Sequence, residues 1–220
     1  MNRLIPAFLA LVIVGGAAWF LMPSNSATNL PQLGAANAQT VENPSELGIE
    51  EMTLGEADAP VQIIEYASYT CPHCRSFHEG TFKDLKAEYI DTGKVEFVYR
   101  EVYFDRFGLW ASMVARCGGE ERFFGITDLI YAQQSDWTQG APADIANNLR
   151  TIGKTAGLTD GELDVCFSDG EKAQNLVNWY EANAAADGVR STPSFVIDGD
   201  LYQNMSLAEF RSILDEKIGG

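Results

Sequence analysis

Two of the chain's four cysteines and both of its histidines lie within eight positions, in the stretch YTCPHCRSFH that runs from Tyr69 to His78. The cysteines are Cys71 and Cys74, and the first histidine is His73. In a chain of 220 residues this concentration points to chemistry. Three kinds fit these side chains: a metal site, a structural crosslink or a redox-active dithiol.

The redox reading follows from the local pattern of the stretch. Pro72 suits the first turn of a helix, where its missing N–H costs nothing. Cys71 would then lie beside unpaired backbone N–H groups and the positive end of the helix dipole, and both favour a thiolate. His73 could donate a hydrogen bond, or a positive charge, to the same sulfur. Cys74, deeper in the helix, is expected to be the less acidic, resolving thiol. A reduced form stabilised in this way makes the disulfide a strong oxidant.

Metal handling is the alternative from a different functional class. Cys71, His73, Cys74 and His78 could bind copper or zinc, and the last two are four residues apart, on one helix face. Pro72 and the helix start instead favour the geometry of thiol exchange, and the sequence holds no second ligand cluster. We therefore expect no metal.

The amino-acid composition limits the classes of molecule that this protein is expected to bind. The chain has 31 acidic and 15 basic residues, a net charge of −16, and no cluster of Lys and Arg. This balance excludes a typical nucleic-acid binder and is typical of a soluble, self-repelling surface. An apolar content of 46% is enough for a hydrophobic core.

The N-terminus predicts export. Met1–Arg3 is basic, and Leu4–Met22 is an uncharged run whose length falls between that of a signal peptide, about 7–15 residues, and that of a membrane span, about 17–25 residues. A small-x-small cleavage site occurs at Ala36–Ala38, unusually far from this run. Residues 1–22 are therefore expected to be a signal peptide or a membrane anchor, and both place the remaining chain outside the cytoplasm. The Ser-, Asn- and Gly-containing segment 23–50 is expected to be a flexible linker.

The folded part is expected to begin near Met52. Val61–Tyr66 and Val95–Tyr103 read as strands, and the segment between them as a helix that ends near Gly93. The core-facing positions of that helix recur every four residues, at Phe77, Thr81, Leu85 and Tyr89. A strand–helix–strand unit of this kind predicts two parallel strands.

Residues from about 105 to 187 are helical in character. Two capping boxes, Thr159 with Glu162 and Ser168 with Glu171, indicate helix starts within this block. Further along, the pattern predicts a hairpin and a last helix. The hairpin strands are Ser194–Ile197 and Leu201–Tyr202, and the helix is capped by Ser206 with Glu209. The element order thus predicts an α/β fold with an inserted, all-helical subdomain.

Two longer stretches, APVQIIEYASYTCPHC and STPSFVIDG, together with this element order, resemble DsbA-type thiol oxidases of the thioredoxin superfamily. The resemblance covers residues 51–220 and implies a thioredoxin-like fold, with a βαβ unit and then a ββα unit. It also implies thiol:disulfide oxidoreductase activity without a cofactor other than the Cys71–Cys74 disulfide.

The resemblance assigns roles to three further residues. Glu65 would be a buried acid that transfers a proton to or from Cys74; the alternative is a strand carboxylate that faces solvent. The Thr192-Pro193 bond would be cis, beside Cys71, where an extended substrate could pair with the backbone. Without the resemblance a trans bond is expected, because about 5–6% of X–Pro bonds in folded proteins are cis.

Cys117 and Cys166, 49 residues apart, remain as a second pair. We expect a structural disulfide, which would contribute about 4 kcal/mol in the chain-entropy account. The alternative is a regulatory pair that tunes the active site.

The expected function is donation of the Cys71–Cys74 disulfide to unfolded or reduced exported proteins. By resemblance, the dithiol would be reoxidised by a quinone-linked thiol oxidase of the membrane, which implies a bacterial periplasm. The alternative within the same fold is an isomerase or reductase. Such proteins are usually oligomers, and segment 23–50 lacks the apolar period of an oligomerisation helix, so a monomer is expected.

Overall fold

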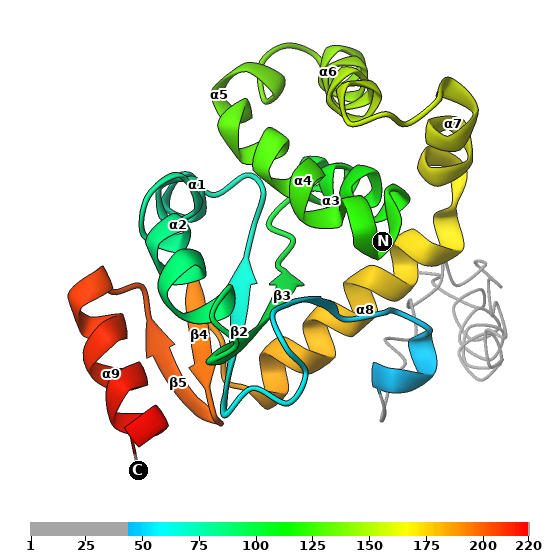
Figure 1. Cartoon of the computed structure of the whole chain (residues 1–220). Helices are drawn as coiled ribbons and strands as arrows, with labels where there is room; N and C mark the ends of the chain where they lie inside the picture. Colours follow the sequence, from blue (N-terminus) through cyan, green and yellow to red (C-terminus); the bar gives the residue numbers. More distant parts are fainter. Residues whose placement is uncertain (1–43, 220) are drawn as a thin grey trace, which may run out of the picture. The chain divides into compact units, whose positions relative to one another are not determined.

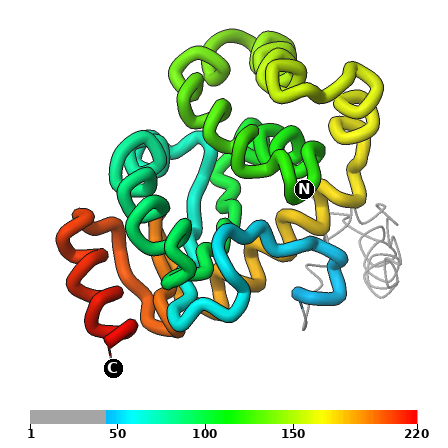
Figure 2. Tube along the Cα trace, in the orientation of Figure 1, coloured from blue at the N-terminus to red at the C-terminus, as the bar shows by residue number. Residues whose placement is uncertain are grey.

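A five-stranded mixed sheet forms the centre of the protein in the computed structural model, which describes residues 44–219. The strands lie in the order β1-β3-β2-β4-β5, so that segments far apart in the sequence are neighbours (Figure 1, Figure 2). Their bounds are Met52–Leu54 (β1), Val61–Ala67 (β2), Val95–Glu101 (β3), Ser194–Ile197 (β4) and Asp200–Gln203 (β5). The expected signal or anchor, 1–22, lies outside the described residues, as does most of 23–50.

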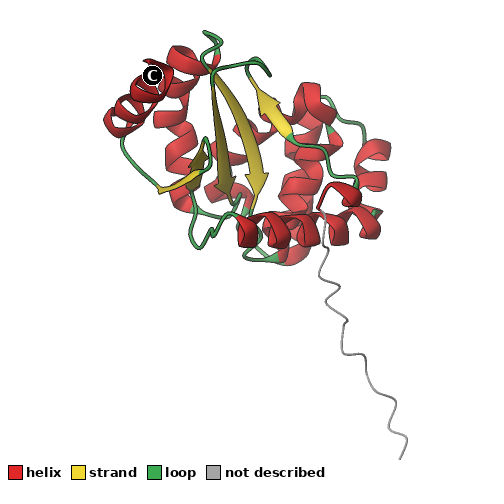
Figure 3. Ribbon diagram, turned by 90° about the horizontal axis from the view of Figure 1, so that it is seen from below, coloured by secondary structure: helices red, strands yellow, loops and turns green. Residues whose placement is uncertain are grey.

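The pair β2–β3 is parallel, as predicted, and the other three pairings are antiparallel. Strand β2 carries apolar side chains on both faces because it is central and covered on both sides (Figure 3). In its register Glu65 is opposite Tyr99 of β3 and Phe195 of β4, so this one carboxylate lies in the middle of the sheet. Strand β1, which pairs with β3, was not predicted from the sequence.

The helical segment between β2 and β3 is broken. It consists of α1 (Pro72–Glu79), α2 (Thr81–Leu85) and a π-helical turn, η2 (Lys86–Ile90). The break falls at Gly80, whose backbone is not helical (φ −121°, ψ −97°). The predicted single helix is therefore wrong in its continuity. Nevertheless, three of its four predicted core positions, Phe77, Leu85 and Tyr89, are buried, and the fourth, Thr81, is half-buried.

The final helix, α9 (Leu207–Gly219), packs beside this segment. The rings of Phe77 and Phe210 lie 5.9 Å apart, and Phe195 of β4 lies 4.8 Å from Phe77. The amino end of α9 has the predicted capping box, because Glu209 accepts from the Ser206 backbone at 2.8 Å.

All of the elements between β3 and β4 are helices. They are α3 (Arg106–Cys117), α4 (Gly119–Ala132), α5 (Gln134–Trp137), α6 (Pro142–Thr155), α7 (Asp160–Ser168) and α8 (Gly170–Ala186). Most of this block lies beyond one end of the strands, whereas α8 returns along the sheet (Figure 1). Ala184 of α8 belongs to a buried cluster with Tyr66, Val102 and Val196. The last turns of α8 therefore cover one face of the sheet.

The two predicted caps within the block have different outcomes. Thr159 and Glu162 form the expected capping box at the start of α7. The box predicted for Ser168 with Glu171 is wrong, because Ser168 is the last residue of α7 and its hydroxyl donates to the Val165 carbonyl. Asp169, the one residue between the two helices, caps α8 instead.

Residues 44–47, at the carboxyl end of the segment expected to be a linker, have a defined structure. Pro44–Leu47 forms a 3₁₀ turn (η1), and the side-chain amide of Asn175 on α8 donates to the Leu47 carbonyl at 3.3 Å. Part of segment 23–50 therefore belongs to the folded unit, which begins before Met52. Within 44–219, none of the helices combines the length and the apolar character that crossing a membrane requires.

Candidate active site

Cys71 lies at the amino end of α1, where β2 leads into the helix. It is the N-cap residue (φ −85°, ψ 119°), and Pro72 follows in the first turn, as the sequence predicts. Its backbone N–H donates to the Ser68 carbonyl at 3.0 Å, which closes a tight turn after the strand. Cys71 is 8% exposed, whereas Cys74, one helical turn further, has no exposed surface. Both thiols are free, so the structure shows the dithiol form.

The surroundings of Cys71 stabilise its thiolate. A hydrogen bond from the Cys74 thiol is the largest influence, and it lowers the pKa of Cys71 to about 5 although burial opposes the shift. Thr192 and the backbone N–H groups of His73 and Cys74 act in the same direction. These N–H groups belong to the first helical turn, where no helical carbonyl is available to them.

Thr192 contacts Cys71 from outside the helix. In the dithiol form the Cys71 thiol donates to the Thr192 carbonyl oxygen at 3.6 Å. The hydroxyl Oγ1 of Thr192 is buried and has no hydrogen-bond partner within the described part of the chain. It is therefore free to donate to a thiolate at Cys71, in agreement with its contribution to the lowered pKa.

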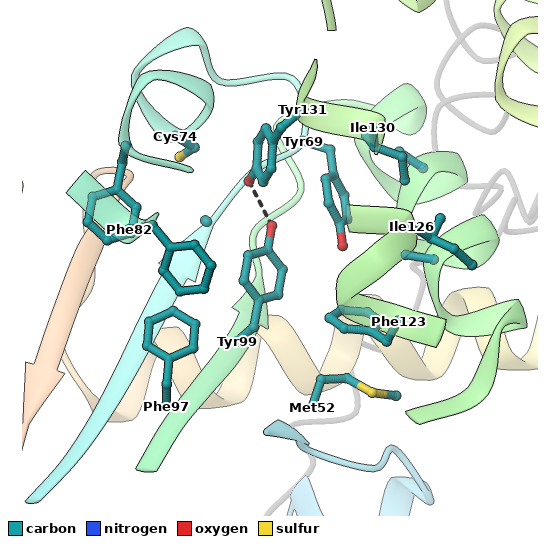
Figure 4. Packing of buried hydrophobic residues seen from close by; sticks show 14 of the residues in the cluster. Met52, Tyr69, Cys74, Phe82, Phe97, Tyr99, Phe123, Ile126, Ile130 and Tyr131 are labelled. Carbon is teal, nitrogen blue, oxygen red and sulfur yellow. Dashed lines mark hydrogen bonds between the residues drawn. The ribbon is translucent and has the colours of Figure 1, made fainter. Parts of the chain in front are cut away.

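The surroundings of Cys74 act in the opposite direction. Burial is the main cause that raises the pKa of this thiol far above its ordinary value, and its hydrogen bond to Cys71 and the negative charge of Glu65 add to the effect. Figure 4 shows the aromatic residues near it, with the hydroxyls of Tyr99 and Tyr131 in contact at 2.7 Å. The two thiols thus differ strongly in acidity.

His73 and His78, five residues apart, have different environments. The His73 side chain is exposed, and its contribution to the Cys71 pKa comes from its backbone N–H. His78 is 3% exposed, and its Nε2 lies 2.8 Å from a carboxylate oxygen of Glu65. Within 44–219 no group of three or more His, Cys, Asp and Glu side chains is placed to hold a metal ion.

Glu65 is completely buried. The alternative of a solvent-facing strand carboxylate is therefore wrong, and the negative charge of Glu65 acts on Cys74. Its pairing with His78 was not foreseen from the sequence, where His78 was considered only as a metal ligand. The spacing in the sequence could have indicated this pairing. A helix that starts at Pro72 places His78 in its second turn, which packs on the preceding strand that carries Glu65.

Two segments outside the βαβ unit, one at Thr192 and one at Gln134, contact the active-site turn. The Thr192-Pro193 peptide bond is cis, and Pro193 is buried just before β4. From α5, the buried side-chain amide of Gln134 donates to the carbonyls of Tyr69 (2.8 Å) and Cys71 (3.0 Å). Sequence reasoning missed Gln134, because nothing in its neighbourhood distinguishes it from other glutamines.

Cys117 and Cys166 form a disulfide between α3 and α7. Both residues lie within the helical block, away from the elements that carry Cys71 and Cys74.

Comparisons with known proteins agree with this architecture. A family model described as Thioredoxin matches residues 48–216. A Rickettsia bellii protein named as a protein-disulfide oxidoreductase is 34% identical over 76% of this chain, and the match spans 64% of the length of that relative. Disulfide bond formation protein D of Bacillus subtilis is 24% identical, over 76% of this chain and 77% of its own length.

One solved structure is similar to this chain over nearly the whole length of the solved protein. The crystal structure of α-DsbA1 from Wolbachia pipientis superposes with a TM-score of 0.69 at 27% identity, covering 80% of this chain and 96% of the other. With the family match and the inserted helical block, this likeness confirms the expected fold. The chain belongs to the thioredoxin family and is one of its DsbA-like members.

Proposed function

We propose that this protein is a thiol:disulfide oxidoreductase that donates its Cys71–Cys74 disulfide to exported proteins during oxidative folding. The observation that carries the proposal is the placement of the two thiols: Cys71 is the N-cap residue of α1 and is 8% exposed, whereas Cys74 has no exposed surface. The pKa of Cys71 is lowered to about 5, while that of Cys74 is raised. A thiolate of low pKa stabilises the reduced protein and is a good leaving group, and both properties favour transfer of the disulfide to a substrate.

The reaction runs in two exchanges. A substrate thiolate attacks the Cys71 sulfur, the Cys71–Cys74 bond breaks, and Cys74 leaves as a thiolate that takes up a proton. A second substrate thiolate then attacks the substrate sulfur of the mixed disulfide and releases the Cys71 thiolate. Two electrons pass from the substrate to the protein, which needs no cofactor besides its own dithiol. Glu65 would provide the proton for buried Cys74.

The substrate would bind over the partly exposed side of Cys71. The proposal assigns backbone pairing to the loop at Thr192 and Pro193, where the Thr192 carbonyl lies 3.6 Å from the Cys71 sulfur. On the other side of Cys71 a pocket separates α1 from the helical block. It is lined by Thr70, Pro72, Arg75, Asp105, Phe107, Gln134, Ser135 and Thr138. A peptide that crosses Cys71 could contact both sides.

The same proposal includes the arrangement of the whole chain. Residues 1–22 would export the protein, as a cleaved signal or as a tether to the inner membrane, and a linker would connect them to the thioredoxin-like unit. The helical insertion would span about 105–187. The working compartment would be the periplasm, the partner a quinone-linked membrane oxidase, and the active form a monomer. Cys117–Cys166 would be a structural disulfide.

Transfer to a reduced, unfolded protein tests the proposal. The oxidised protein would be mixed in equal amount with reduced, denatured ribonuclease A, and thiols of both partners counted over time. We expect the ribonuclease to lose two thiols for each Cys71–Cys74 dithiol that forms. A protein that leaves reduced ribonuclease unchanged but restores activity to scrambled ribonuclease would instead be an isomerase.

A further inference from the structure

The buried pair of Glu65 and His78 leaves two polar atoms without partners. Oε2 of Glu65 lies 2.8 Å from Nε2 of His78. Oε1 of Glu65 and Nδ1 of His78 are also buried, and neither has a hydrogen-bond partner within residues 44–219. Buried polar atoms are nearly always paired, so two such atoms at opposite ends of one hydrogen-bonded pair indicate a role beyond packing.

Aromatic rings hold the imidazole of His78 in place. It stacks on Tyr131, with centroids 4.4 Å apart and planes 17° apart, and Phe82 lies at 4.7 Å. The Tyr99 ring meets it edge-on at 5.7 Å. A ring held on several sides keeps Nε2 directed at Glu65.

His78, although only 3% exposed, borders a pocket on a side separate from the proposed substrate surface. It lines a pocket between the α1–α2 segment and α4, together with Glu79, Lys83 and Asp128. None of these residues lines the pocket beside Cys71. Burial raises the pKa of Asp128, which lines this pocket. The electrostatic effect of His78 on Asp128 lowers the same pKa.

Glu65, at the other end of the pair, is as completely buried as Cys74. The charge of Glu65 acts on Cys74, whose thiol is buried and must gain or lose a proton in each catalytic cycle. The titratable and charged groups around His78 come from β2 (Glu65), α1 (Cys74 and Glu79), α2 (Lys83), β3 (Tyr99) and α4 (Asp128 and Tyr131).

We propose that His78 is a proton relay between the α1–α4 pocket and Glu65, through which Cys74 exchanges its proton with solvent while a substrate covers Cys71. This inference rests on the proposed function. In the outward direction the Cys74 thiol proton moves to Oε1, the proton shared by Oε2 and Nε2 moves onto Nε2, and the proton on Nδ1 leaves to a pocket water. The Glu65–His78 pair takes up one proton from Cys74 and releases one to water, so Cys74 becomes a thiolate and no electrons are transferred. The inward direction protonates Cys74 after it departs from the disulfide.

The relay is tested on the one step in which Cys74 must lose its proton. Ellman's reagent would place a 5-thio-2-nitrobenzoate group on Cys71, and its release by Cys74 would be followed by stopped-flow absorbance across pH. His78→Gln is the central variant, because its amide can still donate to Glu65 but cannot pass a proton on. We expect release to slow by about tenfold or more, since positioned acid–base groups contribute about 10²–10⁴-fold. We also expect a larger solvent isotope effect.

Two further variants separate a relay from a structural role. His78→Ala opens space beside the pocket, and added imidazole should restore release in proportion to its concentration. Lys83→Gln changes the charge of the same pocket outside the relay, and release should stay within about twofold of the wild type. Circular dichroism of each variant checks the fold.

A His78→Gln protein that releases the label at the wild-type rate with the wild-type pH profile would overturn the relay and leave the proposed function standing. A folded His78→Ala protein that imidazole does not rescue would also overturn it. If the label formed on Cys74 in place of Cys71, the assignment of the two thiols would fail, and the relay with it.

Discussion

The side-chain amide of Gln134 donates a 3.0 Å hydrogen bond to the backbone carbonyl of Cys71. The same amide donates to Tyr69 at 2.8 Å, so a residue of the helical block holds both ends of the turn that carries the reactive thiol. The insertion is thereby tied directly to the thioredoxin-like part, and the position of Cys71 depends on both.

Replacing Gln134 with Ala should destabilise the protein by about 1–3 kcal/mol, because the buried carbonyl of Tyr69 loses its donor and that of Cys71 keeps only the backbone N–H of Arg75. For a chain of this size the melting temperature should fall by several degrees. Gln133→Ala, at the partly exposed neighbouring position, is the matched control and should have little effect. Equal melting temperatures for the two variants would contradict the proposed anchoring.

Thr192→Val should raise the pKa of Cys71 by about one unit, because it removes the hydroxyl that donates to the thiolate and keeps the side-chain shape. The protein should become a weaker oxidant by about 30 mV. Thiolate absorbance against pH measures the first effect.

Ser191→Ala serves as the control for Thr192→Val, since the Ser191 hydroxyl lies in the same loop but bonds to Ser194 and Gln203. Its titration should match that of the wild type. An unchanged titration in Thr192→Val would remove this hydroxyl from the mechanism.

Cys74→Ser should accumulate mixed disulfides with substrate proteins, because Cys71 is then attacked and no resolving thiol remains. Cys71→Ser should capture nothing and be inactive, because Cys74 has no exposed surface. Non-reducing gels of the two variants, purified after expression with an exported disulfide protein, show the difference. Capture by Cys71→Ser alone would reverse the assignment.

Loss of the Cys117–Cys166 disulfide should lower stability without changing the reactive pair. The disulfide joins two residues that are 49 positions apart. Such a crosslink should add about 4 kcal/mol to the free energy of unfolding in the chain-entropy account. The variant Cys117→Ala/Cys166→Ala should therefore melt several degrees lower, with the thiolate titration of Cys71 unchanged. A shifted titration would show that the pair tunes the active site and is not purely structural.

The stability of the reduced form should depend on pH through Cys71. Its pKa is about 5 in the folded protein, against about 8.5 in an unfolded chain. Because the folded pKa is the lower one, the thiolate stabilises the reduced fold above that value. The contribution of the Cys71 thiolate to the free energy of unfolding decreases as the pH falls from about 8.5, and it is lost below about pH 5. At pH 7 it should be about 1–2 kcal/mol after allowing for solvent screening. Urea unfolding between pH 4 and 7.5 measures this, and a contribution that grows as the pH falls would contradict it.

Sequence patterns were sufficient for the parts of the fold that depend on local chemistry. The run Val61–Tyr66, the Asp198-Gly199 turn and the capping boxes at Thr159 and Ser206 each combine periodicity with a turn or cap residue, and all appear in the structure. The position of Cys71 at a helix start was likewise readable from Pro72.

What the sequence did not reveal depends on long-range contacts. The three-residue strand β1 has too few residues to show a period and exists because β3 offers a free edge. The pairing of Glu65 with His78 joins a strand to a helix, and the contact of Gln134 with Cys71 joins residues 63 positions apart. The side-chain role of His73 stays a prediction, and the contribution of its backbone N–H to the Cys71 pKa was not foreseen.

The redox potential of the Cys71–Cys74 pair tests the central claim most directly. The protein would be equilibrated with glutathione buffers of graded ratio, and the reduced fraction read from trapped thiols, with Cys117–Cys166 intact. Because the surroundings stabilise the Cys71 thiolate, we predict a potential nearer to about −120 mV, the value for DsbA, than to about −270 mV, the value for thioredoxin. A potential at or below the thioredoxin value would contradict the proposal and identify a reductase.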